Sequence, residues 1–578
     1  MAKRLGILGG GQLGRMLLES ANRINIDVVI LDKENSPAKQ IQAHDQHVSG
    51  SFKNAEDIRK LAEKSNVLTI EIEHVDADML QDLEKQQHGD HQIEIHPSPT
   101  TIKIIQDKYV QKQHLRSHDI TVVDFVGLRS GSETEMKEVV GNLLGYPFML
   151  KSRTDAYDGR GNFAVMSESS VSMAAKTLTN RPLYAERWAP FKMELAVMVV
   201  KTKSTTMAFP VVETIHENNI CKLVYAPPRN VSSKVCQKAQ DLAKKAVSTF
   251  QGKGIYGVEM FLLPDDTLFI NEIAPRPHNS GHYTIEGCYM SQYDAHLRAI
   301  LDLPIPESAL RLRTPSIMLN ILGGSTPDAH LVLSDAALTV PGASVHLYGK
   351  GTGTPGRKMG HITVTAPTMS ETSQLISPLI SIADQISTGQ IYLSTTLPST
   401  VAQEKAQPLV AVIMGSHSDL PTLQPCLTTL TSFSIPFTVR ITSAHRTPQW
   451  MVHYTSTAAE NGIRVIIAAA GGAAHLPGMA AAHTTLPVIG VPVKASSTDG
   501  MDSLLSIVQM PRGVPVATVS IGNGVNAALL AARILGVLDQ RIQDKVEDYA
   551  REAERIVRET DRRLVEEGFE EFLKGMGK

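Results

Sequence analysis

The sequence of 578 residues is poor in cysteine and in aromatic residues, and neither sign of charge dominates. Its four cysteines lie far apart without metal-binding spacing, which is typical of reduced thiols in an intracellular protein. The formal net charge is only −3, so no overall electrostatic field points to nucleic acid or to a membrane surface. We therefore expect no nucleic-acid partner and no membrane partner.

Long apolar runs are also missing, and no stretch reaches the length that a membrane span requires. The N-terminus shows neither the hydrophobic region nor the cleavage site of a signal peptide, which favours a cytoplasmic location. A chain of this length is expected to form three or four domains, and core size is no constraint.

The most informative stretch lies near the middle of the chain. Two apolar runs, residues 258–263 and 268–273, flank the turn sequence Pro-Asp-Asp-Thr at 264–267, which is typical of a β-hairpin. Folding this hairpin about the middle of the turn places Glu259 opposite Glu272, roughly 5 Å away on the same face.

Two facing carboxylates repel each other unless a cation or a shared proton joins them. One interpretation is a solvated face with one strand slipped by a residue. The other is a magnesium site, because Mg²⁺ is held by carboxylates and substrate phosphates, and Asn271 offers another oxygen ligand. The cationic segment that follows, residues 276–282, contains Pro and Gly and suits an anionic second substrate.

The beginning of the chain has the pattern of a βαβ unit. A predicted strand at residues 3–8 leads into Gly-Gly-Gly-Gln-Leu-Gly at 9–14, then a helical pattern at 15–24 and a strand at 27–31 that ends at Asp32. This is the dinucleotide fingerprint, in which glycines admit a ligand and the helix N-terminus favours phosphate. The residues alone leave open nicotinamide-nucleotide binding and a purely structural tight turn.

Other segments suggest phosphate chemistry. After a predicted strand at 148–151, the loop at 152–162 contains glycines and two basic residues, so it can wrap triphosphate oxygens or be an ordinary mobile hairpin. It is not a Walker loop, because no Gly-Lys-Ser/Thr follows. Residues 76–118 have a polar, helical pattern with a loop at 96–99. Three cations among the glycines of residues 348–361 suit a phosphate monoester or a solvated basic turn.

This series of motifs resembles the ATP-grasp enzymes, whose last two metal-binding residues lie on such a hairpin. The sequence Asn-Glu-Ile-Ala-Pro-Arg-Pro-His-Asn-Ser-Gly-His at 271–282 is closer still to the synthetase of 5-(carboxyamino)imidazole ribonucleotide in purine biosynthesis. The resemblance covers about the first 390 residues in the right order. It implies ATP and Mg²⁺ as cofactors, bicarbonate as co-substrate, 5-aminoimidazole ribonucleotide (AIR) as acceptor, and a Rossmann-like first domain that binds no dinucleotide.

The resemblance also assigns roles to particular residues. Glu259 and Glu272 are the implied metal ligands, and Arg276 is an implied catalytic residue. The implied ATP contacts are Lys108, Lys151, Tyr157, Asp158, Gly159, Gly161, Glu186, Glu194 and Asn271. The implied AIR contacts are Gly11, Gln12, Leu13, Glu73, His278, Asn279, Ser280, Lys350, Arg357 and Lys358.

Beyond residue 408 the pattern changes to alternating strands and amphipathic helices, which predicts a parallel sheet with helices on both faces. The expected strands are residues 409–414, 437–442, 464–469, 488–491 and 516–521. Conspicuous loops follow three of them, at 415–419, 443–448 and 471–478. Because ligands of open α/β sheets bind at the carboxyl ends of strands, these loops should converge on one pocket.

These loops offer phosphate donors and titratable groups. Ser416, Ser418, Ser443 and Arg446 can bind phosphate, and Asp419 can hold ribose hydroxyls. Three histidines, His417, His445 and His475, allow a zinc site as an alternative. Each histidine lies among phosphate-type donors with little carboxylate support apart from Asp419, which favours phosphate and proton chemistry.

The same loops resemble the mutase of 5-(carboxyamino)imidazole ribonucleotide, the microbial AIR carboxylase, and the match extends through residues 506–513 and 526–532. A synthetase followed by this mutase is the arrangement of the fungal AIR carboxylase family, whose mutase domains associate as octamers. The resemblance implies that His445 shuttles a proton and that His475 is also catalytic. The implied ribonucleotide contacts are Gly415, Ser416, Ser418, Asp419, Ser443, Ala444, Arg446, Gly471, Gly472 and Ala473. No biotin is expected, since no Met-Lys-Met attachment motif is present.

We therefore expect an α/β protein with an ATP-grasp unit followed by a flavodoxin-like, three-layer parallel-sheet domain. The expected division is a Rossmann-like pre-ATP-grasp domain (1–112), an ATP-grasp domain (113–305), a small β-rich domain (306–395), a linker (396–408), a mutase domain (409–538) and a C-terminal amphipathic helix (539–578). That helix should pack on the core or on a neighbouring subunit through Ile542, Val546, Tyr549, Ala553, Ile556 and Leu564.

The expected reaction is carboxylation of AIR to its carbamate, followed by carboxyl transfer to the ring carbon to give 4-carboxy-5-aminoimidazole ribonucleotide (CAIR). Rival functions are a formate-using ATP-grasp ligase fused to an unrelated α/β domain and a nucleotide-binding sensor or scaffold that has lost catalysis. A dehydrogenase is suggested only by the turn at residues 9–14.

Overall fold

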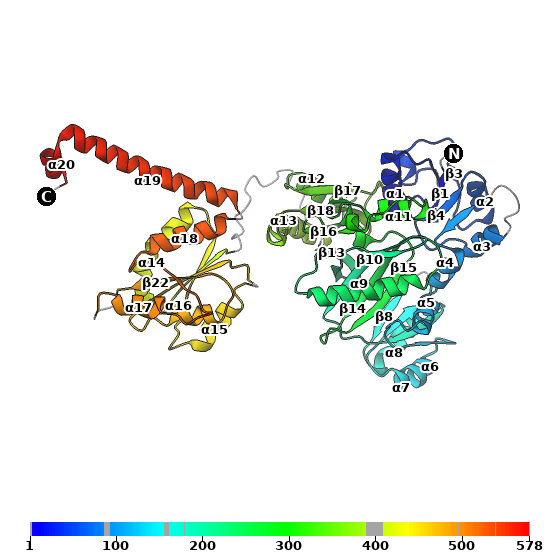
Figure 1. Ribbon diagram of the computed structural model, residues 1–578. Coiled ribbons are helices and arrows are strands. Elements are labelled where there is room, and N and C mark those ends of the chain that lie inside the picture. Colours follow the sequence, from blue (N-terminus) through cyan, green and yellow to red (C-terminus); the bar gives the residue numbers. More distant parts are fainter. Residues whose placement is uncertain are drawn as a thin grey trace. The chain divides into compact units, whose positions relative to one another are not determined.

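The computed structural model describes residues 3–85, 93–154, 161–178, 180–388, 408–459, 461–494, 498–537 and 539–576. The chain divides into two compact units, Met1–Leu393 and Ser394–Lys578, called unit 1 and unit 2 below (Figure 1). Of the predicted linker, residues 396–407 lie outside the described residues.

Parallel strands form the first sheet of unit 1, in the order β3-β2-β1-β4-β5. The central strand β1 pairs with β2 and β4 and is buried throughout, because helices cover both faces of the sheet. The βαβ start predicted from the sequence is confirmed. The elements are β1 (Leu5–Leu8), α1 (Gln12–Arg23), β2 (Val28–Asp32), β3 (Val48–Ser49), α2 (Ala55–Glu63), β4 (Val67–Ile70), α3 (Ala77–Lys85) and β5 (Glu94–His96).

Strand β5 corrects the helical interpretation of residues 76–118. It pairs in parallel with Val67–Thr69 of β4, between helix α3 and helix α4 (Pro99–Gln106). Only its central residue, Ile95, is buried. Three residues are too few to show a strand period in the sequence, so this strand depends on long-range pairing.

The largest sheet of unit 1 is mostly antiparallel, in the order β15-β14-β10-β12-β13-β16-β18-β17, with β11 also on β10. Helix α9 (Ser233–Ser248) covers one face (Figure 1). The strands are β10 (Met193–Lys201), β11 (Thr206–Ala208), β12 (Val212–Glu217), β13 (Ile220–Ala226), β14 (Gly254–Leu262), β15 (Leu268–Ala274), β16 (Ser316–Leu322), β17 (Ala343–Leu347) and β18 (Lys358–Thr365). Because β13 pairs with β16, the strands predicted for the small β-rich domain continue this sheet.

A smaller sheet of unit 1 has the order β6-β9-β7-β8. Its strands are β6 (Phe125–Gly127), β7 (Phe148–Ser152), β8 (Asn162–Val165) and β9 (Leu183–Arg187). The remaining long helices of unit 1 are α5 (Lys108–Ser117), α8 (Val171–Thr177), α11 (Gln292–Ile300), α12 (Ala329–Ala337) and α13 (Met369–Thr388).

Unit 2 contains a parallel sheet in the order β20-β19-β21-β22-β23, with separate hydrophobic clusters on its two faces. This confirms the predicted three-layer fold, and the strand order is the flavodoxin-like one. The elements are β19 (Val410–Met414), α14 (Leu420–Ser432), β20 (Phe437–Ile441), α15 (Pro448–Ser456), β21 (Val465–Gly471), α16 (Leu476–Ala482), β22 (Val488–Val493), α17 (Met501–Val508), β23 (Ala517–Thr518) and α18 (Gly524–Gly536). The last strand is shorter than the expected 516–521, because only two residues pair with the edge of β22.

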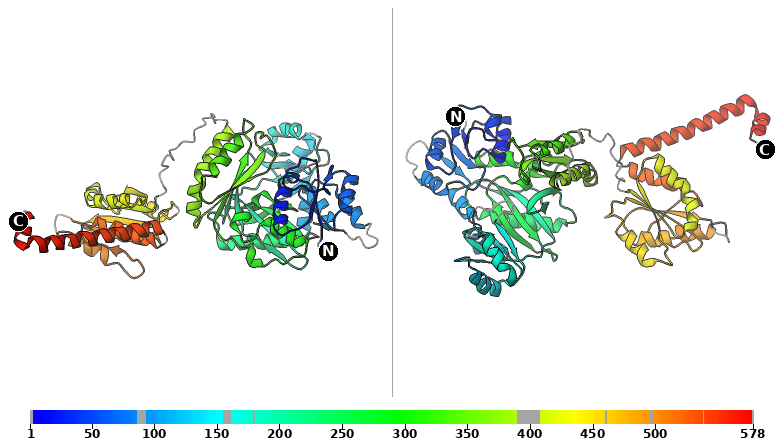
Figure 2. Two further views of the ribbon diagram at one scale, coloured as in Figure 1. Left: turned by 90° about the horizontal axis from the view of Figure 1, so that it is seen from above. Right: turned by 180° about the vertical axis from the view of Figure 1, so that it is seen from behind.

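Helix α19 (Gln540–Glu567) leaves the body of unit 2 as a long rod (Figures 1 and 2). Its first turns pack on the core, where Ile542 is buried and the ring of Tyr549 lies 6.2 Å from that of Phe433. The side chain of Ile556 is 52% exposed. The predicted packing on the core therefore extends only over the first part of the helix, and helix α20 (Phe569–Gly575) follows it.

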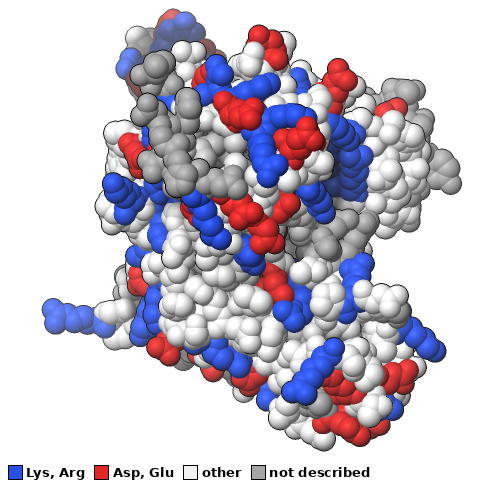
Figure 3. Space-filling view, turned by 90° about the vertical axis from the view of Figure 1, so that its right-hand side faces the viewer, with Lys and Arg blue, Asp and Glu red and all other residues white. Residues whose placement is uncertain are grey.

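The surface carries both signs of charge. Figure 3 shows basic and acidic side chains interspersed over the described part of one face. Among the described residues, none of the helices combines the length and the apolar character that a bilayer crossing needs.

Candidate active sites

The two carboxylates of the central hairpin face each other across β14 and β15. Glu259 pairs directly with Glu272, as predicted, whereas Met260 pairs with Ile270. Asn271 is therefore the extra residue of a β-bulge, and such bulges redirect side chains near functional sites.

The charges of this pair are not equal. Burial raises the pKa of Glu259, and the neighbouring Glu272 raises it further. Burial also acts to raise the pKa of Glu272, but the ammonium of Lys108, which forms an ion pair with it, outweighs this and lowers the pKa. His278 contributes Nε2 at 3.8 Å from Glu259, and burial lowers the pKa of this histidine to about 3. Glu272 is therefore the carboxyl group that is held ionised, and Glu259 is the one that takes up a proton more readily.

Two carboxylates fit a Mg²⁺ ion whose remaining ligands come from phosphates and water. Within the described part of the chain, no cluster of three or more His, Cys, Asp or Glu side chains has metal-binding geometry. Glu259 and Glu272 are suited to share a cation with a phosphorylated substrate, and they are not a closed metal cage.

Beside this hairpin, Glu186 neutralises two lysines. Its carboxylate lies 2.7 Å from Nζ of Lys151 and 3.2 Å from Nζ of Lys112, and its side chain is only 3% exposed. Burial acts to raise the pKa of Glu186, but the two ammonium groups lower it to about 2. Lys151 also donates to Oδ1 of Asn271 at 3.2 Å, so the pair reaches the bulge of the hairpin.

Lys112 was not identified from the sequence. Burial lowers its pKa to about 8 despite the opposing charge of Glu186. It lies one helical turn after Lys108 on α5, so two lysines at positions i and i+4 were the available signal.

Two further ATP contacts predicted from the sequence have defined surroundings. Glu194 on β10 lies 3.0 Å from Nδ1 of His216 on β12. Burial lowers the pKa of His216, but the hydrogen bond and charge of Glu194 outweigh it and raise the pKa. His216 gave no signal in the sequence, because cross-strand pairing creates the contact. Gly161 accepts a hydrogen bond from Ser152 N at 2.7 Å. Tyr157, Asp158 and Gly159 lie outside the described residues.

The glycine-rich turn before α1 surrounds a carboxylate of the chain itself. Gly11 N and Gly14 N donate to the two oxygens of Glu71 at 2.7 and 2.8 Å. A Cβ atom at Gly9 or Gly11 would lie 2.5 Å from the Glu71 side chain. Asp32, the acidic residue at the end of the second predicted strand, accepts a hydrogen bond from Gly10 N at 2.7 Å. The phosphate position of the fingerprint is therefore filled, which favours the structural interpretation of this turn over dinucleotide binding.

Residues implied in the acceptor site form two separate sets of contacts in unit 1, one of which includes the implied catalytic residue Arg276. Glu73 binds the guanidinium of Arg276 through both oxygens, and this charge holds the pKa of Glu73 at about 2 although burial acts to raise it. Gln12 accepts a hydrogen bond from Lys350, which also donates to Lys358 O at 2.8 Å. The first set is an ion pair, and in the second set the positive charge of Lys350 lies next to the polar groups of Gln12 and Lys358.

Other predicted AIR contacts have different surroundings. Leu13 is buried in the core of the first sheet. The carboxamide of Asn279 pairs reciprocally with that of Asn320 at 2.9 and 2.7 Å. Ser280 is fully buried, and its hydroxyl has no hydrogen-bond partner among the described residues. Arg357 reaches Lys350 O at 3.5 Å from an exposed position.

In unit 2 the predicted loops converge at the carboxyl ends of the strands. Nε2 of His445 lies 2.8 Å from Nδ1 of His475. Arg446 donates to Gly415 O at 3.1 Å and also contacts the hydroxyl of Ser443. All three loops thus contribute to one site, as predicted, and the two imidazoles can share a proton.

Backbone hydrogen bonds hold the other donors of this site. Ser416 N donates to Asp419 at 3.0 Å, and burial raises the pKa of Asp419. Gly472 N donates to Ser503 Oγ at 2.8 Å, a contact that the sequence did not indicate. The predicted contacts Ser418, Ala444, Gly471 and Ala473 lie on these same loops.

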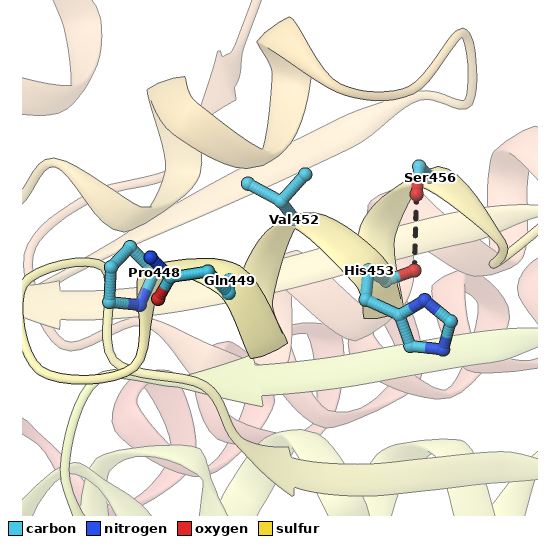
Figure 4. Close-up of a pocket in the computed structure, with 5 residues that line it drawn as sticks. All are labelled: Pro448, Gln449, Val452, His453 and Ser456. Carbon is cyan, nitrogen blue, oxygen red and sulfur yellow. Dashed lines mark hydrogen bonds between the residues drawn. The ribbon is translucent and has the colours of Figure 1, made fainter.

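A separate hollow of about 460 Å³ lies on helix α15 and is lined by Pro448, Gln449, Val452, His453 and Ser456 (Figure 4). Ser456 Oγ donates to His453 O at 3.2 Å there. Only Pro448, the last residue of the loop at 443–448, belongs to the predicted loops, and His453 is the one titratable side chain among the five. This hollow therefore lacks the convergent donors of the loop cluster.

Replacing Glu186 with Gln is expected to lower the free energy of unfolding and to make this free energy depend less on pH in the acid range. The folded-state pKa of about 2 lies below the ordinary 4.5, so this carboxylate contributes stability that is fully present above pH 4.5 and is lost as the pH falls toward 2. The shift corresponds to about 3 kcal/mol. Urea unfolding of wild type and Glu186→Gln at several acid pH values measures this contribution, with Glu168→Gln at an exposed position of unit 1 as control. Parallel pH profiles of wild type and Glu186→Gln would contradict the assignment.

Comparisons with known proteins cover both units. Family models match residues 1–106 (ribonucleotide synthetase preATP-grasp domain), 113–293 (ATP-grasp domain), 316–375 (phosphoribosylaminoimidazole carboxylase C-terminal domain) and 409–555 (AIR carboxylase). The ATP-grasp synthetase and AIR carboxylase resemblances inferred from the motifs are thereby confirmed.

Curated relatives match over the whole chain. The phosphoribosylaminoimidazole carboxylases of Candida glabrata and Saccharomyces cerevisiae are each 52% identical to this chain, and 99% of each chain is covered. A crystal structure of carboxyaminoimidazole ribonucleotide synthase from Aspergillus clavatus with ATP is 58% identical at a TM-score of 0.64, and it covers 67% of this chain and 99% of its own. A second structure from that organism, with ADP and 5-aminoimidazole ribonucleotide, is 57% identical. The chain belongs to the phosphoribosylaminoimidazole carboxylase family.

Proposed function

We propose that this enzyme carries out two consecutive steps of purine biosynthesis, namely ATP- and bicarbonate-dependent carboxylation of AIR and transfer of the carboxyl group to the ring carbon, which gives CAIR. The observation that carries the proposal is that each unit holds a site of its own: the hairpin carboxylates with their lysines in unit 1, and the His445–His475 pair in unit 2. The full-length similarity to phosphoribosylaminoimidazole carboxylases supports it.

In the first step ATP phosphorylates bicarbonate to give carboxyphosphate and ADP. Mg²⁺ held by Glu259 and Glu272 would supply positive charge to the phosphates. Lys108 and Lys151 neutralise the carboxylates around this position and lie where they can bind phosphate oxygens. The AIR amine then takes up the activated carboxyl group, or the carbon dioxide released from it, with loss of phosphate.

Arg276 and His278 lead into the loop that would face the acceptor. Glu73 holds Arg276 in place through two hydrogen bonds. Lys350 and Lys358 would bind the phosphate of AIR, and Gln12 orients Lys350. Because the carbamate product is labile, a closed and dry site is expected to matter.

In the second step the carbamate C–N bond breaks, the amine gains a proton, and the ring carbon attacks the trapped carbon dioxide. The ring carbon then loses its proton, so the number of protons balances. His445 is positioned for this transfer, because His475 can hold or supply a proton across their 2.8 Å contact. The enamine-like ring supplies the carbon nucleophile, and no biotin is required.

Steady-state kinetics test the two-site proposal. Wild type and His445→Ala should hydrolyse ATP with bicarbonate at rates that AIR stimulates equally, because unit 1 is intact in both. CAIR should accumulate with wild type. With His445→Ala the rate of CAIR formation should be at least about 100-fold lower, because that is the usual contribution of a general acid–base residue. Glu272→Gln provides the reciprocal control, since it should lose ATP hydrolysis and still convert synthetic carbamate to CAIR.

The outcomes separate the two assignments. If AIR does not stimulate ATP hydrolysis by wild type, the assignment of unit 1 is wrong. If formate replaces bicarbonate as the substrate that supports hydrolysis, the rival ligase is correct. If His445→Ala makes CAIR within about tenfold of the wild-type rate, His445 is not the proton shuttle and His475 is the next candidate.

We also propose that unit 2 mediates association into a homo-oligomer, which the family resemblance predicts to be an octamer. Beyond Tyr549, apolar side chains of α19 such as Ile556 and Leu564 are partly exposed. The charged residues of this helix pair with one another along it, for example Arg558 with Glu554. An apolar face is therefore left for a partner subunit. We likewise propose that the chain has the domain boundaries predicted above and is located in the cytoplasm.

Sedimentation velocity tests this association. The double variant Ile556→Asp and Leu564→Asp should shift the protein to smaller species, because it places charge on the apolar face. Val565→Asp is the control, since Val565 is exposed but lies two and a half turns from Ile556, on the opposite side of the helix. An unchanged distribution in the double variant would exclude this face as the interface.

A further inference from the structure

A row of side chains crosses three strands of the large sheet of unit 1. Asn320 on β16 pairs directly with His361 on β18, which pairs with His346 on β17. Directly paired residues lie on the same face of a sheet, so these three side chains form one row. Asn320 and His361 are buried.

A second set of three residues lies on this row. This set consists of Asn279 in η4 (Asn279–Gly281), His282 just after η4, and Glu286 in α10 (Thr284–Gly287). The spacings of three and four residues place their side chains on one face of a helical segment. This segment continues the loop that begins at Arg276 and His278.

The two sets meet one to one. Asn279 and Asn320 exchange two amide hydrogen bonds, at 2.9 and 2.7 Å. The ring of His282 stacks on that of His361 at 4.6 Å. Glu286 accepts a hydrogen bond from His346 at 2.7 Å, and the His346 ring stacks on His361 at 4.5 Å. The contacts are an amide pair, a ring stack and a hydrogen bond to a carboxylate, so a shift of the loop along the row would mismatch all three.

Buried tyrosines fix the orientation of the central imidazoles. Tyr293 OH donates to Nδ1 of His282 at 2.9 Å, and Tyr348 OH donates to Nδ1 of His361 at 3.0 Å. Both rings are fully buried, and neither Nε2 has a hydrogen-bond partner among the described residues. Leaving two such groups unpaired costs stability, and apolar residues of similar size would avoid that cost. Packing alone therefore does not account for two stacked histidines here.

The row joins the two parts of the proposed acceptor site. The loop carries Arg276 and His278, whereas Lys350 follows Tyr348 by two residues and Lys358 begins β18, three residues before His361. We propose that the contacts Asn279–Asn320, His282–His361 and Glu286–His346 are positioning contacts that set the distance between these two parts and so determine the affinity for AIR. This inference rests on the proposed function of unit 1.

The test separates AIR binding from ATP chemistry. Glu286→Ala and His346→Ala should each raise the KM for AIR roughly tenfold, as expected when one charged hydrogen bond is lost. The double variant should be no worse than the single variants, because they break the same contact. The KM for ATP and the AIR-independent hydrolysis of ATP with bicarbonate should stay within about twofold of wild type, since neither residue touches the hairpin lysines.

Conservative and neighbouring variants serve as controls. Glu286→Gln keeps an oxygen acceptor for His346 and should restore much of the affinity for AIR. Thr363→Val alters a buried residue two positions from His361 on the same strand and should leave the KM for AIR unchanged. Because His361→Leu removes a buried ring and risks misfolding, the more accessible Glu286–His346 pair carries the test.

Titration calorimetry with AIR separates the possible failures. If wild type binds AIR but folded Glu286→Ala and His346→Ala bind it equally well, the row is structural only and the inference is overturned. The same holds if the KM values for ATP and AIR rise in parallel. If wild type itself does not bind AIR, the proposed function of unit 1 fails, and the inference fails with it.

Discussion

The repulsion between two buried carboxylates on one hairpin face is the constraint on which unit 1 depends. Glu259 and Glu272 cannot both be ionised in this environment without nearby positive charge. Lys108 supplies part of that charge directly to Glu272. Lys151 donates to Asn271 in the bulge next to Glu272, and Glu186 holds this lysine in place. The hairpin, helix α5 and the smaller sheet are thereby joined by charge as well as by packing.

This balance of charge suits a substrate that brings both negative charge and a cation. A magnesium–triphosphate complex would place its cation between the carboxylates and its phosphates near the lysines, so that the existing ion pairs exchange partners. By contrast, the turn at Gly9–Gly14 satisfies its own backbone donors with Glu71 and needs no anionic ligand. In unit 2 the loops at the carboxyl ends of the strands are polar. The His445–His475 contact and the hydrogen bond from Arg446 to Gly415 O connect these loops.

Much of the fold could be predicted from the sequence, because its signals are local. The hairpin follows from two apolar runs around one turn, and the parallel sheet of unit 2 follows from alternating strand and helix patterns. The pairing of Glu259 with Glu272 also depends on the bulge at Asn271, because nearer the turn the strands pair one residue out of the predicted register. Strand β5 could not be predicted, since three residues carry no period and Ile95 is held by pairing with distant residues. The predicted length of β23 was too great, because pairing with β22 ends after two residues and the sequence does not show where pairing ends.

The candidate site shows the same division. Motifs identified residues next to conspicuous turns, such as Glu259, Arg276 and His445. They missed Glu71, Lys112 and His216, each of which matters through a partner far away in the sequence. The sequence also did not show that Asn279 pairs with Asn320, because that contact joins a loop to a strand 41 residues further on.

We expect the hairpin to keep Glu272 ionised and Glu259 readily protonated until a cation and a triphosphate bind. Isothermal titration calorimetry with Mg²⁺ and a non-hydrolysable ATP analogue, in buffers of different ionisation enthalpy, measures the protons exchanged on binding. Because burial and Glu272 raise the pKa of Glu259, binding to wild type near neutral pH should release protons, and Glu259→Gln should release fewer. Binding that releases no protons, or the same release from wild type and Glu259→Gln, would contradict the account.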